Sequence, residues 1–194
     1  MAPVEVTSSE VSPTVVPPAR PGSPLRAIAR WLRDLSLSVV IAVMVILFLY
    51  QPVKVEGTSM MPALSDQERI FINKFVYRSL GTIQRGDMVV FWYPRDPSKS
   101  YIKRVIGLPG DSISIDRGTV IVNGTRLQET YVPPQYEDEQ SMPPVVVQPD
   151  DYFVLGDHRS ASSDSRAWGT VPRRYIYGKA VFVYWPLDKL GLLK

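Results

Sequence analysis

An almost wholly apolar run over residues 35–50 is the feature that most constrains the fold of this 194-residue chain. Apolar side chains occur on every face of a helix drawn through the run, whereas a helix on the surface of a soluble domain is apolar along one stripe. At helical rise the run measures about 24 Å, slightly short of the roughly 20 residues that a membrane span prefers. Trp31, Leu32 and Val53 can extend it at its ends.

Three kinds of segment fit this run: a buried helix of a soluble domain, a cleaved signal peptide, and a retained signal-anchor helix. A cleavage site requires small residues just after the run, but the residues that follow are Gln51-Pro52-Val53-Lys54. We therefore expect a retained transmembrane helix. Pro52 should end it, because proline has no N–H to donate to the helix.

Basic residues before the run indicate its orientation. Arg26, Arg30 and Arg33 precede it and only Lys54 follows closely, so the positive-inside rule places the N-terminus in the cytoplasm. We predict a disordered, proline-rich cytoplasmic tail over residues 1–25 and a transmembrane signal-anchor helix with its basic flank over residues 26–52. An extracytoplasmic β-rich domain follows over residues 53–194, and within it residues 126–150 are polar and proline-broken, which predicts a loop or small insertion.

Short apolar or alternating runs, separated by turn residues, characterise the chain after residue 53. They predict strands over residues 69–76, 88–93, 101–106, 112–116, 119–122, 152–155 and 176–184. Asp116-Arg117-Gly118 and Asn123-Gly124 are typical hairpin turns, and a turn explains the second better than the glycosylation sequon that it begins. We predict a mainly β fold: an antiparallel β-sheet sandwich or barrel with one N-terminal transmembrane helix.

The composition excludes several classes of function. The net charge of +3, with 21% charged residues, is too mild to argue for nucleic-acid binding. Cysteine is absent, which excludes disulfides, thiolate metal sites and cysteine nucleophiles. The single histidine, His158, and scattered carboxylates provide no metal-ligand spacing. We therefore expect no metal and no cofactor.

A lysine inside an apolar run is the best candidate for unusual chemistry. Lys103 lies in the run over residues 101–106, where burial would lower its pKa and allow it to act as a base. A serine hydroxyl is a weak nucleophile until such a base removes its proton, and Ser59 lies upstream in Gly57-Thr58-Ser59-Met60-Met61-Pro62. Taken alone, Ser59 could order a turn, Lys103 could reach water from an edge strand, and His158 could serve a serine triad.

Four segments, in this order after the apolar run, resemble the shared segments of type I signal peptidases. They are Gly57-Thr58-Ser59-Met60-Met61-Pro62-Ala63-Leu64, Arg85-Gly86-Asp87-Met88-Val89-Val90-Phe91, Tyr101-Ile102-Lys103-Arg104-Val105-Ile106-Gly107-Leu108-Pro109-Gly110-Asp111 and Gly156-Asp157-His158-Arg159-Ser160-Ala161-Ser162-Ser163-Asp164-Ser165-Arg166-Ala167-Trp168-Gly169. The resemblance implies a membrane-bound serine endopeptidase that removes signal peptides from exported preproteins after small residues of the Ala-x-Ala type.

The resemblance also implies a role for each matching residue. Ser59 would be the nucleophile, with its backbone N–H at the oxyanion, and Lys103 would be the general base. Ser162 would hydrogen-bond and orient the lysine amine. Asp164 and Arg166 would form a supporting ion pair, which Arg104 could share. The positions that match a shallow pocket for a small P1 residue are Val55, Met60, Leu64, Tyr101 and Ile102.

Three positions depart from the family pattern. Gly57 stands two residues before the nucleophile, where some members place a serine hydroxyl at the oxyanion, so a backbone N–H or a water would be the second donor. His158 stands where asparagine is usual, and Ser160 replaces a commoner acidic residue. Both changes alter the hydrogen bonding expected in the last segment.

The expected substrate is the extended segment after a signal helix, bound along an edge strand near residues 101–106. The lipid bilayer, of a bacterial-type plasma membrane or a thylakoid-type membrane, would hold enzyme and substrate together. Two alternatives remain. One is another serine-lysine protease, such as a self-cleaving repressor or a processing enzyme for mature membrane proteins. The other is a non-enzymatic membrane-tethered β domain, which predicts that Ser59 and Lys103 lie too far apart to hydrogen-bond.

Overall fold

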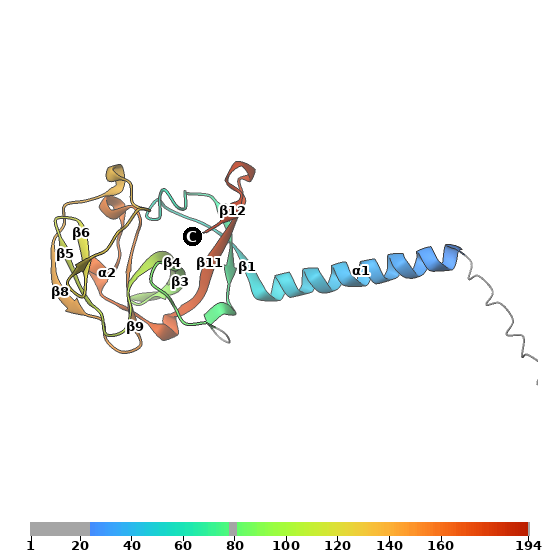
Figure 1. The fold of residues 1–194 in the computed structure, drawn as a ribbon, viewed down its shortest axis with the longest axis horizontal. Coiled ribbons are helices and arrows are strands. Elements are labelled where there is room, and N and C mark those ends of the chain that lie inside the picture. The colour runs from blue at the N-terminus through green and yellow to red at the C-terminus, as the bar shows by residue number, and fades with distance from the viewer. Residues whose placement is uncertain (1–23, 78–80, 194) are drawn as a thin grey trace, which may run out of the picture. The chain divides into compact units, whose positions relative to one another are not determined.

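The computed structural model describes residues 24–77 and 81–193, and helix α1 runs over Pro24–Leu49 (Figure 1). Residues 1–23, nearly all of the predicted tail, lie outside the described residues. The helix ends at Leu49 and not at Pro52, because strand β1 (Tyr50–Lys54) begins at the next residue. Pro52 is tolerated in β1 because β1 lies at the edge of its sheet. Among the described residues, no helix combines the length and apolar content that a membrane crossing requires.

The chain after β1 consists mainly of antiparallel strands, as predicted. They are β2 (Arg69–Asn73), β3 (Met88–Tyr93), β4 (Asp96–Gly107), β5 (Ser112–Asp116), β6 (Thr119–Val122), β7 (Thr125–Arg126), β8 (Met142–Val146), β9 (Asp151–Leu155), β10 (Val171–Pro172), β11 (Ile176–Trp185) and β12 (Gly191–Leu192), with a short helix α2 (Ser165–Trp168) after β9. Within the described residues they form an eight-stranded sheet in the order β1-β2-β11-β3-β4-β9-β10, with β12 beside β11. The second sheet has four strands in the order β7-β6-β5-β8.

Both faces of the larger sheet are covered by buried side chains. In β3, Val89 and Phe91 contribute to one core cluster, which includes Trp168, whereas Met88 and Val90 contribute to another. A strand buried on both faces is apolar at consecutive positions. This explains why the sequence shows a continuous apolar run in β3 and not an alternating one.

The smaller sheet is organised by the two hairpin turns that the sequence predicts. Arg117 and Gly118 join β5 to β6, and Asn123 and Gly124 join β6 to β7, all four with positive φ (44° to 78°). Two consecutive residues with positive φ are the mark of a type I′ hairpin turn. The expected loop or insertion over residues 126–150 contains β8, which completes this sheet beside β5.

The two sheets share a third core cluster. Ile106 at the end of β4 and Phe153 in β9 pack with Ile113 and Val120 of the smaller sheet. Figure 1 shows β5, β6 and β8 at one end of the β domain and β1, β11 and β12 at the other. Strand β4 contributes Val105 to the first cluster and Ile106 to the third, so it connects the larger sheet to the core that it shares with the smaller one.

Strand pairing along β4 creates a strand edge beside its lysine. Residues 100–104 of β4 pair with β3, and Lys103 lies opposite Val89. On the other side, β9 pairs with β4 from Arg104 onward, where Arg104 lies opposite Leu155. The backbone just before Lys103 is thus at the edge of the sheet, whereas the backbone after it is in the interior.

Candidate active site

Ser59 lies in the loop between β1 and β2, and contacts on several sides hold this loop. Gly57 has φ +91°, in the left-handed region that favours glycine, and its N–H donates to Oδ1 of Asp66 at 2.8 Å. Met60 and Leu64 are buried, at 2% and 0% exposure, and anchor the loop in the core. The backbone N–H of His158 donates to the Ser59 carbonyl at 3.1 Å.

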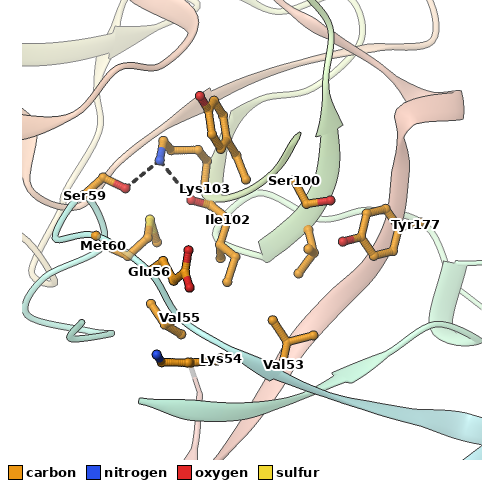
Figure 2. Close-up of a pocket in the computed structure, with 13 residues that line it drawn as sticks. Val53, Lys54, Val55, Glu56, Ser59, Met60, Ser100, Ile102, Lys103 and Tyr177 are labelled. Atoms are coloured by element: carbon orange, nitrogen blue, oxygen red, sulfur yellow. Dashed lines mark hydrogen bonds between the residues drawn. The ribbon is translucent and has the colours of Figure 1, made fainter. Parts of the chain in front are cut away.

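The side chains of Ser59 and Lys103 meet, as the sequence predicts. Lys103 Nζ lies 2.6 Å from Ser59 Oγ and within hydrogen-bonding distance, 3.1 Å, of the Ile102 carbonyl oxygen (Figure 2). The Tyr101 ring centroid is 5.5 Å from the amine, and Lys103 is only 4% exposed. This geometry contradicts the non-enzymatic alternative, which requires the two groups to lie apart.

Burial perturbs the acid–base behaviour of the lysine. Removal of the ammonium from water lowers the pKa of Lys103 from 10.5 to about 8, although the negative charges of Asp164 and Asp157 oppose the decrease. At mildly alkaline pH a large fraction of the amine is therefore unprotonated. An unprotonated amine 2.6 Å from a serine hydroxyl can accept its proton.

The last motif segment brings Asp164 and Arg166 together as predicted. Nε and Nη2 of Arg166 donate to the two Asp164 carboxylate oxygens, each at 2.8 Å. Asp164 is fully buried, and its Oδ2 also accepts the Gly156 N–H at 3.1 Å. Arg104 makes its bidentate ion pair with Asp157, at 2.9 and 2.7 Å. Asp157 was not predicted as a site residue, although it lies inside the matching segment.

Ser162 departs from the prediction. Its hydroxyl oxygen is buried but forms no hydrogen bond within the described part of the chain, so the expected bond to the Lys103 amine is not made. It lies beside Gly156, where an added Cβ would approach Ser162 Oγ to 2.2 Å and the Ser59 carbonyl oxygen to 2.5 Å. Gly156 therefore brings Ser162 and the nucleophile loop close together, a contact that requires the absence of a side chain.

His158 holds the nucleophile loop from the outside. Its Nδ1 is 3.2 Å from the Thr58 carbonyl oxygen, to which it can donate, and its ring packs edge-on against Tyr136 at 4.7 Å between centroids. This contact fits a structural role better than that of a triad base. Among residues 24–77 and 81–193, no three His, Asp or Glu side chains gather where a metal ion could be held.

A cleft of about 210 Å³ opens beside the two reactive groups. Val55, Met60, Tyr101 and Ile102 line it as predicted, but Leu64 does not, because it is fully buried in the core. Several further lining residues were not predicted: Lys54, Glu56, Val90, Ser100 and Tyr177. Strand register identifies one of them, since Val90 lies opposite Ile102. Figure 2 shows Ser59 and Lys103 at one end of the cleft and Tyr177 at the other.

Comparisons with known proteins point to one family. The family model described as "Signal peptidase, peptidase S26" matches residues 28–185. A signal peptidase I from Leptolyngbya laminosa is 36% identical, over 97% of each chain. A probable signal peptidase I-2 from Synechocystis sp. is 41% identical over 80% of this chain and 72% of its own. A signal peptidase I from Bacillus licheniformis is 35% identical over 82% of this chain and 90% of its own.

Proposed function

The chain belongs to the signal peptidase family, peptidase S26, and is a peptidase; from this premise we propose that it cleaves signal peptides from preproteins with a Ser59–Lys103 dyad. The observation that carries the proposal is the 2.6 Å contact between Ser59 Oγ and the buried Lys103 amine. The family match over residues 28–185 favours a signal peptidase over the self-cleaving repressor.

In the proposed mechanism, the neutral Lys103 amine accepts the Ser59 hydroxyl proton as Oγ attacks the scissile carbonyl carbon. The resulting ammonium then donates that proton to the leaving amine, and the C–N bond breaks to leave an ester on Ser59. A water molecule, deprotonated by the same amine, hydrolyses the ester and regenerates the hydroxyl. A pKa of about 8 suits both transfers, because the ammonium is acidic enough to return the proton.

The tetrahedral intermediate carries an oxyanion that needs hydrogen-bond donors about 3 Å away. We propose the Ser59 backbone N–H as one donor. The Gly57 N–H is an unsuitable second donor, because Asp66 already accepts it at 2.8 Å. A bound water or another N–H of the nucleophile loop would take that role.

The cleft supports an extended substrate. One wall is the edge of β4 at residues 100–102 and the other is the segment from Val53 to Gly57, so a substrate strand could hydrogen-bond to backbone on either side. Val55, Met60 and Ile102 would bound a shallow apolar pocket for a small P1 side chain. This arrangement is the basis for proposing cleavage after Ala-x-Ala.

The groups behind the dyad would support it indirectly. Asp164, held by Arg166, contributes negative charge that favours the Lys103 ammonium formed during the reaction. The Ser162 hydroxyl has no partner within the described residues, which leaves it available to accept a hydrogen bond from that ammonium. We therefore retain Ser162 as a proposed orienting residue.

The test uses the full chain in detergent with a preprotein that carries an Ala-x-Ala site. We expect cleavage after the second alanine, read by mass spectrometry, and a loss of at least ~10³-fold in Ser59→Ala and in Lys103→Ala. The exposed residues Ser160 and Lys99 provide matched controls, and Ser160→Ala and Lys99→Ala should cleave like the parent. Undiminished cleavage by Lys103→Ala would rule out the dyad.

We further propose that the apolar half of α1 anchors the enzyme in a lipid bilayer, with the N-terminus cytoplasmic and residues 53–194 outside the cytoplasm. Large apolar side chains along it, including Val40 and Ile41, are more than half exposed, and lipid would cover them. Resistance to carbonate extraction, with the β domain digestible by protease from the extracytoplasmic side, would support the anchor. Release by carbonate would contradict it.

A further inference from the structure

The irregular segment between β7 and β8, residues 127–141, reaches the last motif segment with three side chains. Glu129 accepts two hydrogen bonds from the Arg159 guanidinium, at 2.7 and 2.5 Å. Asp138 forms an ion pair with Nη1 of Arg166. The Tyr136 ring packs against His158. These contacts join residues that are separated by about 20 to 30 positions in the sequence, and no role was predicted for this segment.

Asp138 is the outer end of a hydrogen-bonded chain that ends at Gly156, beside the loop that carries Ser59. Arg166 donates from Nη1 to Asp138 and from Nε and Nη2 to Asp164. Asp164 in turn accepts the N–H of Gly156, which lies against the Ser59 loop. The Asp138 and Arg166 side chains are only 9% and 8% exposed, so neither is an ordinary surface charge.

The buried charges around the dyad leave one negative charge in excess, because Arg166 has two carboxylate partners. Arg104 pairs with Asp157 and Arg159 pairs with Glu129, and each of these two pairs is neutral. Arg166 pairs with both Asp164 and Asp138. Desolvation lowers the pKa of the Arg166 guanidinium, but hydrogen bonds and charges from the two carboxylates outweigh it, so the pKa lies above its ordinary value. Arg166 therefore stays cationic, and its single positive charge is shared between two carboxylates.

We propose that Asp138 is a positioning residue of the active site: it fixes Arg166 and Asp164 behind the dyad and, by sharing the Arg166 charge, leaves Asp164 as a counter-charge for the ammonium that Lys103 becomes during catalysis. The inference rests on the proposed dyad mechanism. Its physical basis is that a buried ammonium is costly unless negative charge lies near it, and proton transfer from Ser59 creates that ammonium in a site where Lys103 is 4% exposed.

The test compares pH profiles of kcat/KM for preprotein cleavage, because such profiles report ionisations of the free enzyme. Asp138→Asn removes the charge at nearly constant shape. We expect the acid limb to move to lower pH by about 0.5 unit, because the ammonium loses a favourable charge, and the maximum to fall about 10-fold. Asp138→Glu retains the charge and should keep the limb within ~0.2 unit of the parent.

Glu139→Gln is the matched control, because Glu139 is exposed and one residue away from Asp138. The acid limb of its pH profile should stay within ~0.2 pH unit of that of the parent. Thermal unfolding establishes that each variant is folded, and Asp138→Ser replaces Asp138→Asn if the latter does not fold. An unshifted acid limb in the charge-removing variant would overturn the inference even if the maximum falls, since a merely structural role lowers the rate at all pH values. Absence of Ser59-dependent cleavage by the parent would instead overturn the proposed function.

Discussion

Replacement of Lys103 by methionine should stabilise the protein at neutral pH and lose that advantage at alkaline pH. The pKa of Lys103 is about 8 in the folded protein and 10.5 as its ordinary value, so between these pH values the unfolded chain binds more protons than the folded one. Above pH 10.5 the lysine is neutral in both states, and the folded protein has its full stability. As the pH falls through 8, that stability is lost, because the folded protein must then bury an ammonium. At pH 7, the 2.5-unit difference corresponds to a cost of about 3 kcal/mol.

Lys103→Met keeps a similar shape but has no charge to bury. The difference in unfolding free energy between Lys103→Met and the parent should therefore be about 3 kcal/mol more favourable to the variant at pH 7 than at pH 10.5. Contributions that do not depend on pH, such as side-chain packing, cancel in this comparison. Titration of other groups cancels as well, since both proteins share them.

Urea unfolding of the full chain in detergent measures the difference, with tryptophan fluorescence as the signal and the buried Trp168 as a reporter. Lys99→Met is the control, because Lys99 lies in the same strand, is exposed, and has a pKa raised by its hydrogen bond to Asp96. Its stability contribution is present at low pH and lost as the pH rises, so this control should not gain stability at pH 7. A difference in unfolding free energy between Lys103→Met and the parent that stays constant with pH would contradict this prediction.

Three further predictions concern the same site. The kcat/KM of the parent should fall about tenfold per pH unit below about pH 8 and level off above it, as a profile over pH 6 to 10 would show; a flat profile contradicts a titrating lysine. Gly156→Ala should lose at least ~100-fold in kcat, because its Cβ would lie 2.2 Å from Ser162 Oγ; full activity would show that Ser162 and the loop that carries Ser59 move to accommodate the methyl group without disturbing the dyad. Ser162→Ala should gain about 1 kcal/mol in urea unfolding, because a buried hydroxyl without a partner is removed, while activity falls about 10-fold; unchanged activity would remove Ser162 from the proposed site.

Local patterns predicted the parts of the fold that short-range chemistry decides. The two hairpin turns follow from glycine and asparagine at positions that need positive φ. The apolar run in β3 predicted a core strand, because burial on both faces leaves no polar position. The prediction that the helix ends at Pro52 was wrong. The chain enters an edge strand at Tyr50, and an edge strand tolerates proline. The end of the helix therefore depends on the pairing of β1 with β2.

The site was predictable where the matching segments carry the partners: Ser59 and Lys103 lie in two of these segments, and Asp164 and Arg166 lie together in the last one. It was not predictable where a side chain's direction depends on tertiary packing. Leu64 matched a pocket position but is fully buried in the core.

Long-range ion pairs lay beyond the reach of the sequence. Glu129 and Asp138 come from a segment without a motif, and their partners, Arg159 and Arg166, lie about 30 residues further along the chain. Only the folded chain brings them together, because charged residues have many possible partners and sequence spacing does not select among them.

Direct titration of the Lys103 amine shows whether burial lowers its pKa enough for it to act as a base. The full chain, labelled with ¹³C at lysine Cε, would be followed by NMR in detergent between pH 6 and 11, with Lys103→Arg to assign the signal. The account predicts a midpoint near the pKa of about 8 that burial produces. A midpoint at the ordinary lysine value, above roughly pH 10, would contradict it.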